Sequence, residues 1–172
     1  SLIMQKKYFN FQPKGMNTNM SFKFQSNEYA TYMKNIRLTE DNNGVLSLQF
    51  EKGNTKLLDI SGTPIGVCIL NKYLIIFTHS TRLKGTEISS TTDNIYRIEI
   101  KEDTLNKELL FSGNLNFDIN HPIETLGVYE NENIQKVYWV DGKNQPRVIN
   151  IVAPEDIKNS WNSSSFDFVQ EL

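Results

Sequence analysis

The fold of this chain is decided by residues 65–77, which read IGVCILNKYLIIF. Two apolar runs, residues 65–70 and 73–77, are joined there by Asn71 and Lys72. A short apolar run bounded by turn residues is typical of a strand that is buried on both faces, and so short a joint is typical of a hairpin. We therefore predict that this stretch forms a buried antiparallel hairpin.

The segments on either side continue the β pattern. Residues 45–51 alternate apolar and polar side chains directly after an Asn43-Gly44 pair, which is the signature of a tight hairpin turn. Residues 94–101 alternate isoleucine with charged side chains. This period of two predicts strands that bury one face and expose the other.

The whole pattern predicts an all-β fold. About ten short strands are separated by turn signals every 8–12 residues, and strands do not alternate with helices. The one helical signal is at residues 154–161, where a proline and two acidic residues stand at the start. Antiparallel strands arranged as β-propeller-like blades or as a β-sandwich fit best, with a short helix near the C-terminus, and a barrel would use the same strands.

We expect the chain to divide near residue 35. Residues 1–35 are weakly patterned and are predicted to form an extended N-terminal arm or loop, whereas residues 36–172 are predicted to form the antiparallel β domain. Residues 166–172 alternate apolar and polar side chains as if a strand were beginning. For this reason we expect the chain to be the N-terminal fragment of a longer protein.

A polar stretch separates two of the predicted strands. Residues 79–93 are rich in serine and threonine and contain few large apolar side chains. Such a composition between periodic segments is typical of a surface loop, and surface loops commonly carry function. We therefore predict a mobile surface loop there.

Composition argues against several classes of function. The 18 basic and 20 acidic residues leave a formal net charge of −2, which argues against sequence-specific binding of nucleic acid. A single cysteine excludes a disulfide framework, and two histidines are too few for a His-only zinc site. No apolar run approaches the length of about 18 residues that a membrane-spanning helix needs. We predict no catalytic, cofactor-binding or metal-binding residues and no cofactor.

Three reactive side chains are candidates for catalytic groups. Cys68 lies inside the most apolar run, where we expect an inert buried thiol because reactive thiols need an accessible, electropositive setting. His79 follows a predicted strand and His121 precedes a proline. Neither has the sequence context of a known catalytic motif, and we expect both to be structural.

Exposed aromatic side chains would suggest a different activity, the binding of sugars. Tyr138, Trp139 and Trp161 are the candidates for such a platform, although aromatic residues in an all-β chain are more often part of the core.

Residues 141–144 have oxygen ligands beside a glycine but lack the spacing of a calcium loop. This segment is most simply a hairpin turn.

The chain also carries motifs that resemble a family of virion proteins. They are YWVD at residues 138–141, KGMNTNMS at 14–21, NEYA at 27–30, KNIRL at 34–38, GVCILNKYL at 66–74 and HPIETLG at 121–127. Together they are similar to the N-terminal part of the proteins known as stabilisation proteins in crAss-like phages of gut Bacteroidales, and the resemblance covers nearly the whole chain.

The resemblance implies a non-enzymatic structural role. Such a protein would sit at the head–tail or tail region of the virion, after synthesis in the cytoplasm of the bacterial host, a place that agrees with the lack of a visible signal peptide. It would contact portal or tail components and form homo-oligomers in its full-length form. The alternative hypothesis is a carbohydrate-binding or adhesion β-domain of a gut bacterium.

Overall fold

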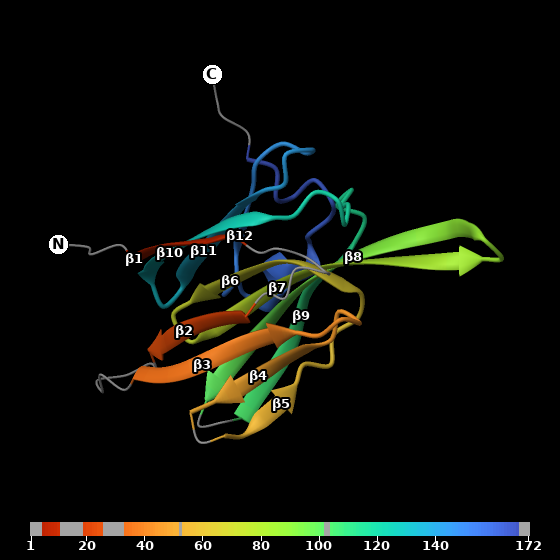
Figure 1. The fold of residues 1–172 in the computed structure, drawn as a ribbon. Coiled ribbons are helices and arrows are strands. Elements are labelled where there is room, and N and C mark those ends of the chain that lie inside the picture. The colour runs from red at the N-terminus through yellow and green to blue at the C-terminus, as the bar shows by residue number, and fades with distance from the viewer. Residues whose placement is uncertain (1–4, 11–18, 26–32, 52, 102–103, 169–172) are drawn as a thin grey trace.

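The computed structural model describes residues 5–10, 19–25, 33–51, 53–101 and 104–168. These residues form three four-stranded antiparallel sheets, stacked in three layers, and one short helix (Figure 1). The predicted all-β antiparallel class is confirmed. None of the sheets in this described part of the chain closes into a barrel.

Two of the sheets are simple meanders, in which neighbouring strands follow one another along the chain. The central sheet consists of β6 (Thr63–Leu70), β7 (Tyr73–Lys84), β8 (Glu87–Lys101) and β9 (Thr104–Gly113). The first outer sheet consists of β2 (Asn19–Gln25), β3 (Met33–Glu40), β4 (Leu46–Phe50) and β5 (Thr55–Leu57).

The third sheet joins the two ends of the described chain. This second outer sheet consists, in spatial order, of β1 (Gln5–Asn10), β10 (Glu124–Asn131), β11 (Ile134–Val140) and β12 (Arg147–Asn150). Strands β1 and β2 both fall within residues 1–35, where the sequence predicts an extended arm or loop. The rest of that stretch lies outside the described residues, and the proposed division at residue 35 stays a prediction.

The apolar hairpin predicted at residues 65–77 is β6 and β7, and its side chains are buried on both faces as predicted. Val67 and Leu74 belong to the core shared with the first outer sheet. Cys68 and Ile75, their neighbours in the chain, belong to the core shared with the second outer sheet. Because successive side chains of a strand point to opposite faces, a continuous apolar run is what a middle layer requires.

The central and second outer sheets approach each other closely at two glycines. A Cβ atom on Gly66 would lie 2.6 Å from Ile123 Cβ, and one on Gly127 would lie 3.1 Å from Cys68 Sγ. Two hydrogen bonds fasten the same contact: Thr125 Oγ1 donates to the carbonyl oxygen of Val67 over 2.8 Å, and the Ile123 amide donates to that of Ile65 over 2.8 Å. The layers are thus fixed by backbone as well as by side-chain packing.

The C-terminal part of the described chain packs against the sheets. The predicted helix is α1 (Glu155–Asn159), with Pro154 just before it. Its Lys158 and the β8 residue Arg97 both pair with Glu108 of β9. The hydrogen bond from Lys158, together with the charge of Arg97, lowers the pKa of Glu108 although partial burial opposes this. The helix is therefore tied to the central sheet.

Beyond the helix, the chain returns to the edge of the second outer sheet. Asp167 forms an isolated antiparallel bridge with Arg147 of β12. Its neighbours Phe166 and Phe168 lie on opposite sides, the first buried in the core and the second exposed. The predicted strand at residues 166–172 is thus present as a single bridge, and residues 169–172 lie outside the described part.

Candidate functional site

The most distinctive feature of the molecule is a two-stranded extension of the central sheet. We call residues 80–92 the protruding hairpin; it consists of the second half of β7 and the first half of β8. Pairing of β6 with β7 stops at His79, and pairing of β9 with β8 starts at Asp93. Both outer edges of the hairpin are therefore unpaired among the described residues, and it projects far from the body (Figure 1).

The sequence predicted a mobile loop here, and that prediction is wrong in conformation although right in exposure. Residues 81–92 are all exposed, but they form a two-stranded ladder with β7–β8 pairs from Ser80–Thr92 to Lys84–Glu87, interrupted by one register shift between Arg82 and Leu83. Threonine is β-branched and favours strands, so a Ser/Thr-rich stretch can continue a hairpin without an apolar face. Gly85 closes the tip with a φ of 69°.

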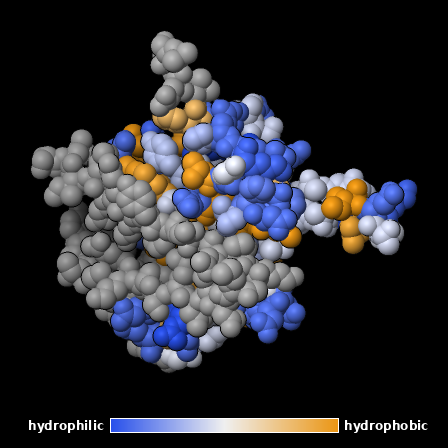
Figure 2. Space-filling model, turned by 45° about the horizontal axis from the view of Figure 1, so that its top comes forward, coloured by the Kyte–Doolittle hydropathy of each residue, from blue (hydrophilic) through white to orange (hydrophobic). Residues whose placement is uncertain are grey.

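The tip carries an apolar pair between charged side chains. Leu83 and Ile88 are cross-strand partners, and their side chains are 60% and 62% exposed. Arg82, Lys84 and Glu87 are next to them along the two strands, and none of the three makes a side-chain hydrogen bond or ion pair with another described residue. Apolar colour near the end of the projection marks this pair in Figure 2. Exposed, paired apolar side chains on a projection are typical of an interaction surface.

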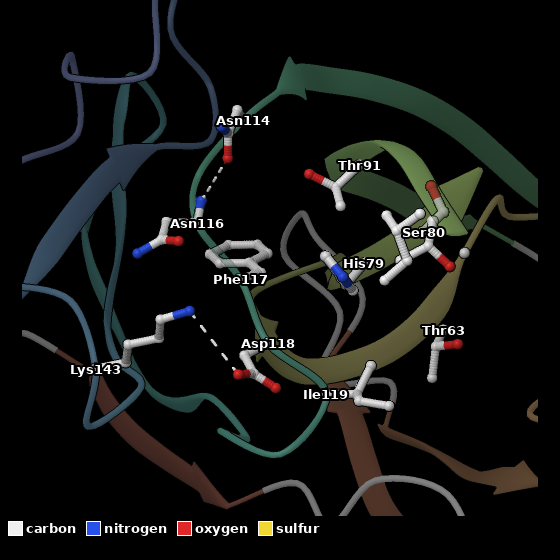
Figure 3. Close-up of a pocket in the computed structure, with 13 residues that line it drawn as sticks. Thr63, His79, Ser80, Thr91, Asn114, Asn116, Phe117, Asp118, Ile119 and Lys143 are labelled. Carbon is white, nitrogen blue, oxygen red and sulfur yellow. Dashed lines mark hydrogen bonds and ion pairs between the residues drawn. The ribbon is translucent and has the colours of Figure 1, made fainter. Parts of the chain in front are cut away.

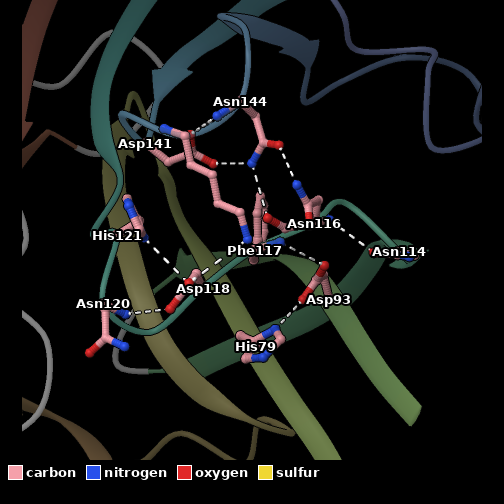
Figure 4. A network of polar contacts seen from close by, with 11 residues as sticks. His79, Asp93, Asn114, Asn116, Phe117, Asp118, Asn120, His121, Asp141 and Asn144 are labelled. Carbon is pink, nitrogen blue, oxygen red and sulfur yellow. Dashed lines mark hydrogen bonds and ion pairs between the residues drawn. The ribbon is translucent and has the colours of Figure 1, made fainter.

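At the root of the hairpin, a buried carboxylate holds the two strands to the body. Asp93 of β8 accepts hydrogen bonds from the backbone amides of Leu115 (2.8 Å) and Phe117 (3.2 Å). Its other oxygen lies 2.6 Å from Nδ1 of His79, its cross-strand partner on β7 (Figure 4). Asp93 is fully buried, so these bonds replace the water that an ion needs.

The loop that contains Leu115 and Phe117 is also hydrogen-bonded to residues 141–144, the turn after β11. Asn116 and Asn144 exchange two hydrogen bonds of 2.8 and 3.0 Å, and Asn144 also donates to Asp141 over 2.7 Å (Figure 4). Burial alone would raise the pKa of Asp141, but hydrogen bonds from Asn144 and from the Lys143 amide outweigh it and lower that pKa. The predicted simple hairpin turn at residues 141–144 is thus part of the brace.

The last member of this polar network is Asp118. It accepts a hydrogen bond from the Asn120 amide, the main cause of its lowered pKa, and lies 3.4 Å from His121 Nδ1 and 3.8 Å from Lys143 Nζ. Both histidines of the chain therefore contact carboxylates near the hairpin root. No local sequence pattern predicts either contact, because both partners depend on how the loops fold back.

A groove of about 690 Å³ lies beside the root (Figure 3). It is lined by hairpin residues and by the braced loops, among them His79, Ser80, Thr91, Asn116, Phe117, Asp118 and Lys143. Most of these polar groups already have a hydrogen-bond or ion-pair partner, and no cluster of three potential metal ligands occurs among the described residues. The arrangement is suited to stiffening the root more than to holding a small molecule.

The aromatic platform expected of a sugar-binding domain does not form. Trp139 is 2% exposed and packs on Phe77 with ring centroids 5.0 Å apart. Trp161 packs edge-on against Phe166, with ring centroids 5.2 Å apart. Tyr138 points to the opposite face of β11 from Trp139. The three candidates therefore do not share a surface.

The remaining candidate, Cys68, is fully buried in the core between the central and second outer sheets, as predicted. None of the helices in the described part of the chain is long and apolar enough to cross a membrane.

Comparison with known proteins gives two matches. A family model described as crassvirus muzzle protein matches residues 6–172. A curated relative, the muzzle protein of Bacteroides phage crAss001, is 45% identical over 167 residues, covering 91% of this chain. The chain spans 11% of the length of that relative.

Proposed function

The chain belongs to the crassvirus muzzle protein family, whose members are structural proteins of the virion, and we propose that it is a contact domain for virion assembly, with the protruding hairpin as its contact element. The finer role follows the expectation from the sequence: stabilisation of the head–tail or tail region through contacts with portal or tail components, in a homo-oligomer of the full-length protein.

The observation that carries this proposal is the contrast between a rigid root and an uncovered tip. The tip exposes Leu83 and Ile88, while the root is fixed by Asp93 and its three partners. A two-stranded hairpin alone is marginally stable in water, and a preorganised element loses less conformational entropy on binding. A braced, exposed hairpin is what a protein–protein contact needs.

The stacking of the sheets supports a second part of the proposal, namely that they are propeller-like blades. The central sheet and the first outer sheet are four-stranded meanders that pack face to face, as neighbouring blades do. In the second outer sheet, β1 comes from a distant part of the chain to complete four strands. Further sheets of a longer muzzle protein would continue the series.

The test is to shorten the hairpin in the full-length muzzle protein. Ser80 and Thr92 are cross-strand partners, so residues 81–91 can be replaced by Asn-Gly, which closes a two-residue turn. We expect a folded protein that is lost from purified virions or that yields particles without a complete tail. As the matched control, Leu109→Asp changes an exposed apolar residue of β9 outside the hairpin and should leave assembly unchanged. Normal assembly with the shortened hairpin would contradict the proposal.

A further inference from the structure

The outward face of the second outer sheet carries a group of apolar side chains. Leu126, Tyr138 and Val148 are in register across β10, β11 and β12, and they point away from the core because their chain neighbours point into it. Val140 lies on the same face of β11 as Tyr138, and Phe168 packs edge-on against Tyr138 with ring centroids 6.2 Å apart. We call these five residues the outer patch.

The outer patch is incompletely covered by the described part of the chain. Val140 is 41% exposed and Phe168 is 44% exposed, whereas the other three side chains are half-buried. Lys136 lies beside the patch on the same face of β11 and is half-buried as well. Figure 2 brings this side of the molecule forward and shows apolar colour on it. Neighbouring exposed apolar side chains are typical of a surface that packs against further protein.

The outward face of the first outer sheet, at the other end of the stack, is polar. Thr39 and Ser47 are cross-strand partners on this face, and their hydroxyl oxygens lie 2.7 Å apart. Arg37 and Gln49 form the next cross-strand pair on it, and both are exposed. Leu57 is the one large apolar side chain there among those of β3, β4 and β5 that the structure describes. Such a face can end a stack, as the polar outer faces of capping repeats do in proteins built from stacked units.

The contact that would cover the outer patch is of a kind that the chain already makes twice. The central sheet packs one apolar face against each outer sheet. Successive elements of a chain are usually neighbours in space, so a following sheet is expected beside the sheet that precedes it. The chain spans 11% of the length of the crAss001 muzzle protein, so about nine-tenths of that relative lies outside the matched region. A further sheet of the same protein is therefore the occupant that this architecture favours.

We propose that a sheet formed by the part of the muzzle protein that follows residue 172 packs on the outer patch, whereas the first outer sheet forms the end of the stack. The inference rests on the proposed function for the continued series of sheets, and it adds where and in which direction the series continues. Val140 and Phe168 would be buried in the longer protein, as the side chains between the other layers are. The sheets would form an open series that is extended from one side.

The accessibility of introduced cysteines tests the proposal. Val140→Cys should react with a maleimide at least about tenfold more slowly in the full-length muzzle protein than in the 172-residue chain, because a covered thiol is inaccessible. The matched control is Leu57→Cys, which is 72% exposed in this chain and should react equally, within about twofold, in both proteins. Labelling is read from the peptide that contains each position, and Cys68 is fully buried. Unchanged reactivity of Val140→Cys, or protection at both positions, would overturn the proposal.

A photo-cross-link identifies what covers the patch. Glu124 is exposed and is the direct cross-strand neighbour of Val140, so a benzophenone amino acid in place of Glu124 would stand at the rim of the patch. In the full-length protein we expect a cross-link within one chain, to a residue after 172, with no doubling of the chain mass in a denaturing gel. A cross-link to a second chain, or no cross-link, would overturn the proposal.

The same experiments separate this inference from the proposed function. If shortening the hairpin blocks virion assembly while Val140→Cys stays reactive in the full-length protein, the contact role of the hairpin stands and this inference is wrong. If Val140→Cys is protected while the shortened hairpin assembles normally, this inference stands and the contact role of the hairpin is wrong.

Discussion

Strands β7 and β8 run from the most buried part of the molecule into its most exposed part. From Tyr73 to Thr78, every residue of β7 is buried, and in β8 residues 93–96 are buried likewise. From Thr81 to Thr92 the same ladder continues with exposed side chains only. The ladder of backbone hydrogen bonds fixes the conformation in both halves of these strands. Burial of apolar side chains, in contrast, stabilises only the inner half.

The largest effect is expected from a truncation in the inner half. Phe77 is fully buried and packs on Trp139 and Phe117 with ring centroids 5.0 and 6.3 Å away. Phe77→Ala should lower the free energy of unfolding by about 3–5 kcal/mol, since it leaves a cavity between two layers. Urea denaturation would measure this loss, and a loss below about 1 kcal/mol would show that the layers are not packed as described.

The junction between the two halves should give the next largest effect. Asp93→Ala removes the acceptor for the Leu115 and Phe117 amides and leaves both unpaired in the interior. We expect a cost of about 3 kcal/mol, with the 114–122 loop loosened, because unpaired buried groups lose their full hydration. The comparison variant is His79→Ala, which removes one partner of Asp93 but keeps the amide bonds, and it should cost less. Equal costs would mean that the loop amides do not depend on Asp93.

The brace beside the root predicts a dependence of stability on acid. The folded-state pKa of Asp141 lies below its unfolded value, so the carboxylate stabilises the fold above the unfolded pKa of about 3.9, and this contribution is lost as the pH falls through the folded pKa. The pKa of Glu108 is lowered as well, so its carboxylate contributes stability with the same dependence on pH. Unfolding free energies measured from pH 6 to pH 2 should therefore fall, and Asp141→Asn should flatten the curve. An unchanged slope in that variant would contradict the assignment.

The smallest effects are expected in the outer half. Leu83→Ala and Thr91→Ala change side chains that contact solvent, so each should alter the unfolding free energy by no more than about 0.5 kcal/mol. In thermal denaturation this corresponds to a shift in Tm of about 2 °C or less. A much larger loss from Leu83→Ala would show that the tip is packed against the body and is not available to a partner.

The buried inner half of β7 and β8 could be predicted from the sequence, whereas the exposed outer half could be predicted only in part. Residues 65–77 require a two-sided buried hairpin because a continuous apolar run has no exposed face. The polar stretch at residues 79–93 predicted exposure correctly but conformation wrongly, since serine and threonine occur both in loops and in exposed strands. What decides between them is the strand pairing that continues outward from the buried half.

The polar root could not be predicted, because its partners are far apart in the chain. His79 and Asp93 are 14 residues apart, and Asn116 and Asn144 are 28 residues apart. No local pattern marks such pairs, and each residue alone is typical of a turn or a strand end. Sequence motifs predicted a resemblance to virion proteins of crAss-like phages, and the comparisons identify the family as that of the muzzle proteins.

The most direct test of the account is hydrogen–deuterium exchange of the protruding hairpin, measured in the isolated chain and in the muzzle protein of intact virions. The amides of the inner halves of β7 and β8 should exchange slowly in both. Residues 80–92 should exchange rapidly in the isolated chain and become protected in the virion, because a partner then covers the hairpin. Equally rapid exchange of residues 80–92 in both states would contradict a role of the hairpin as the contact element.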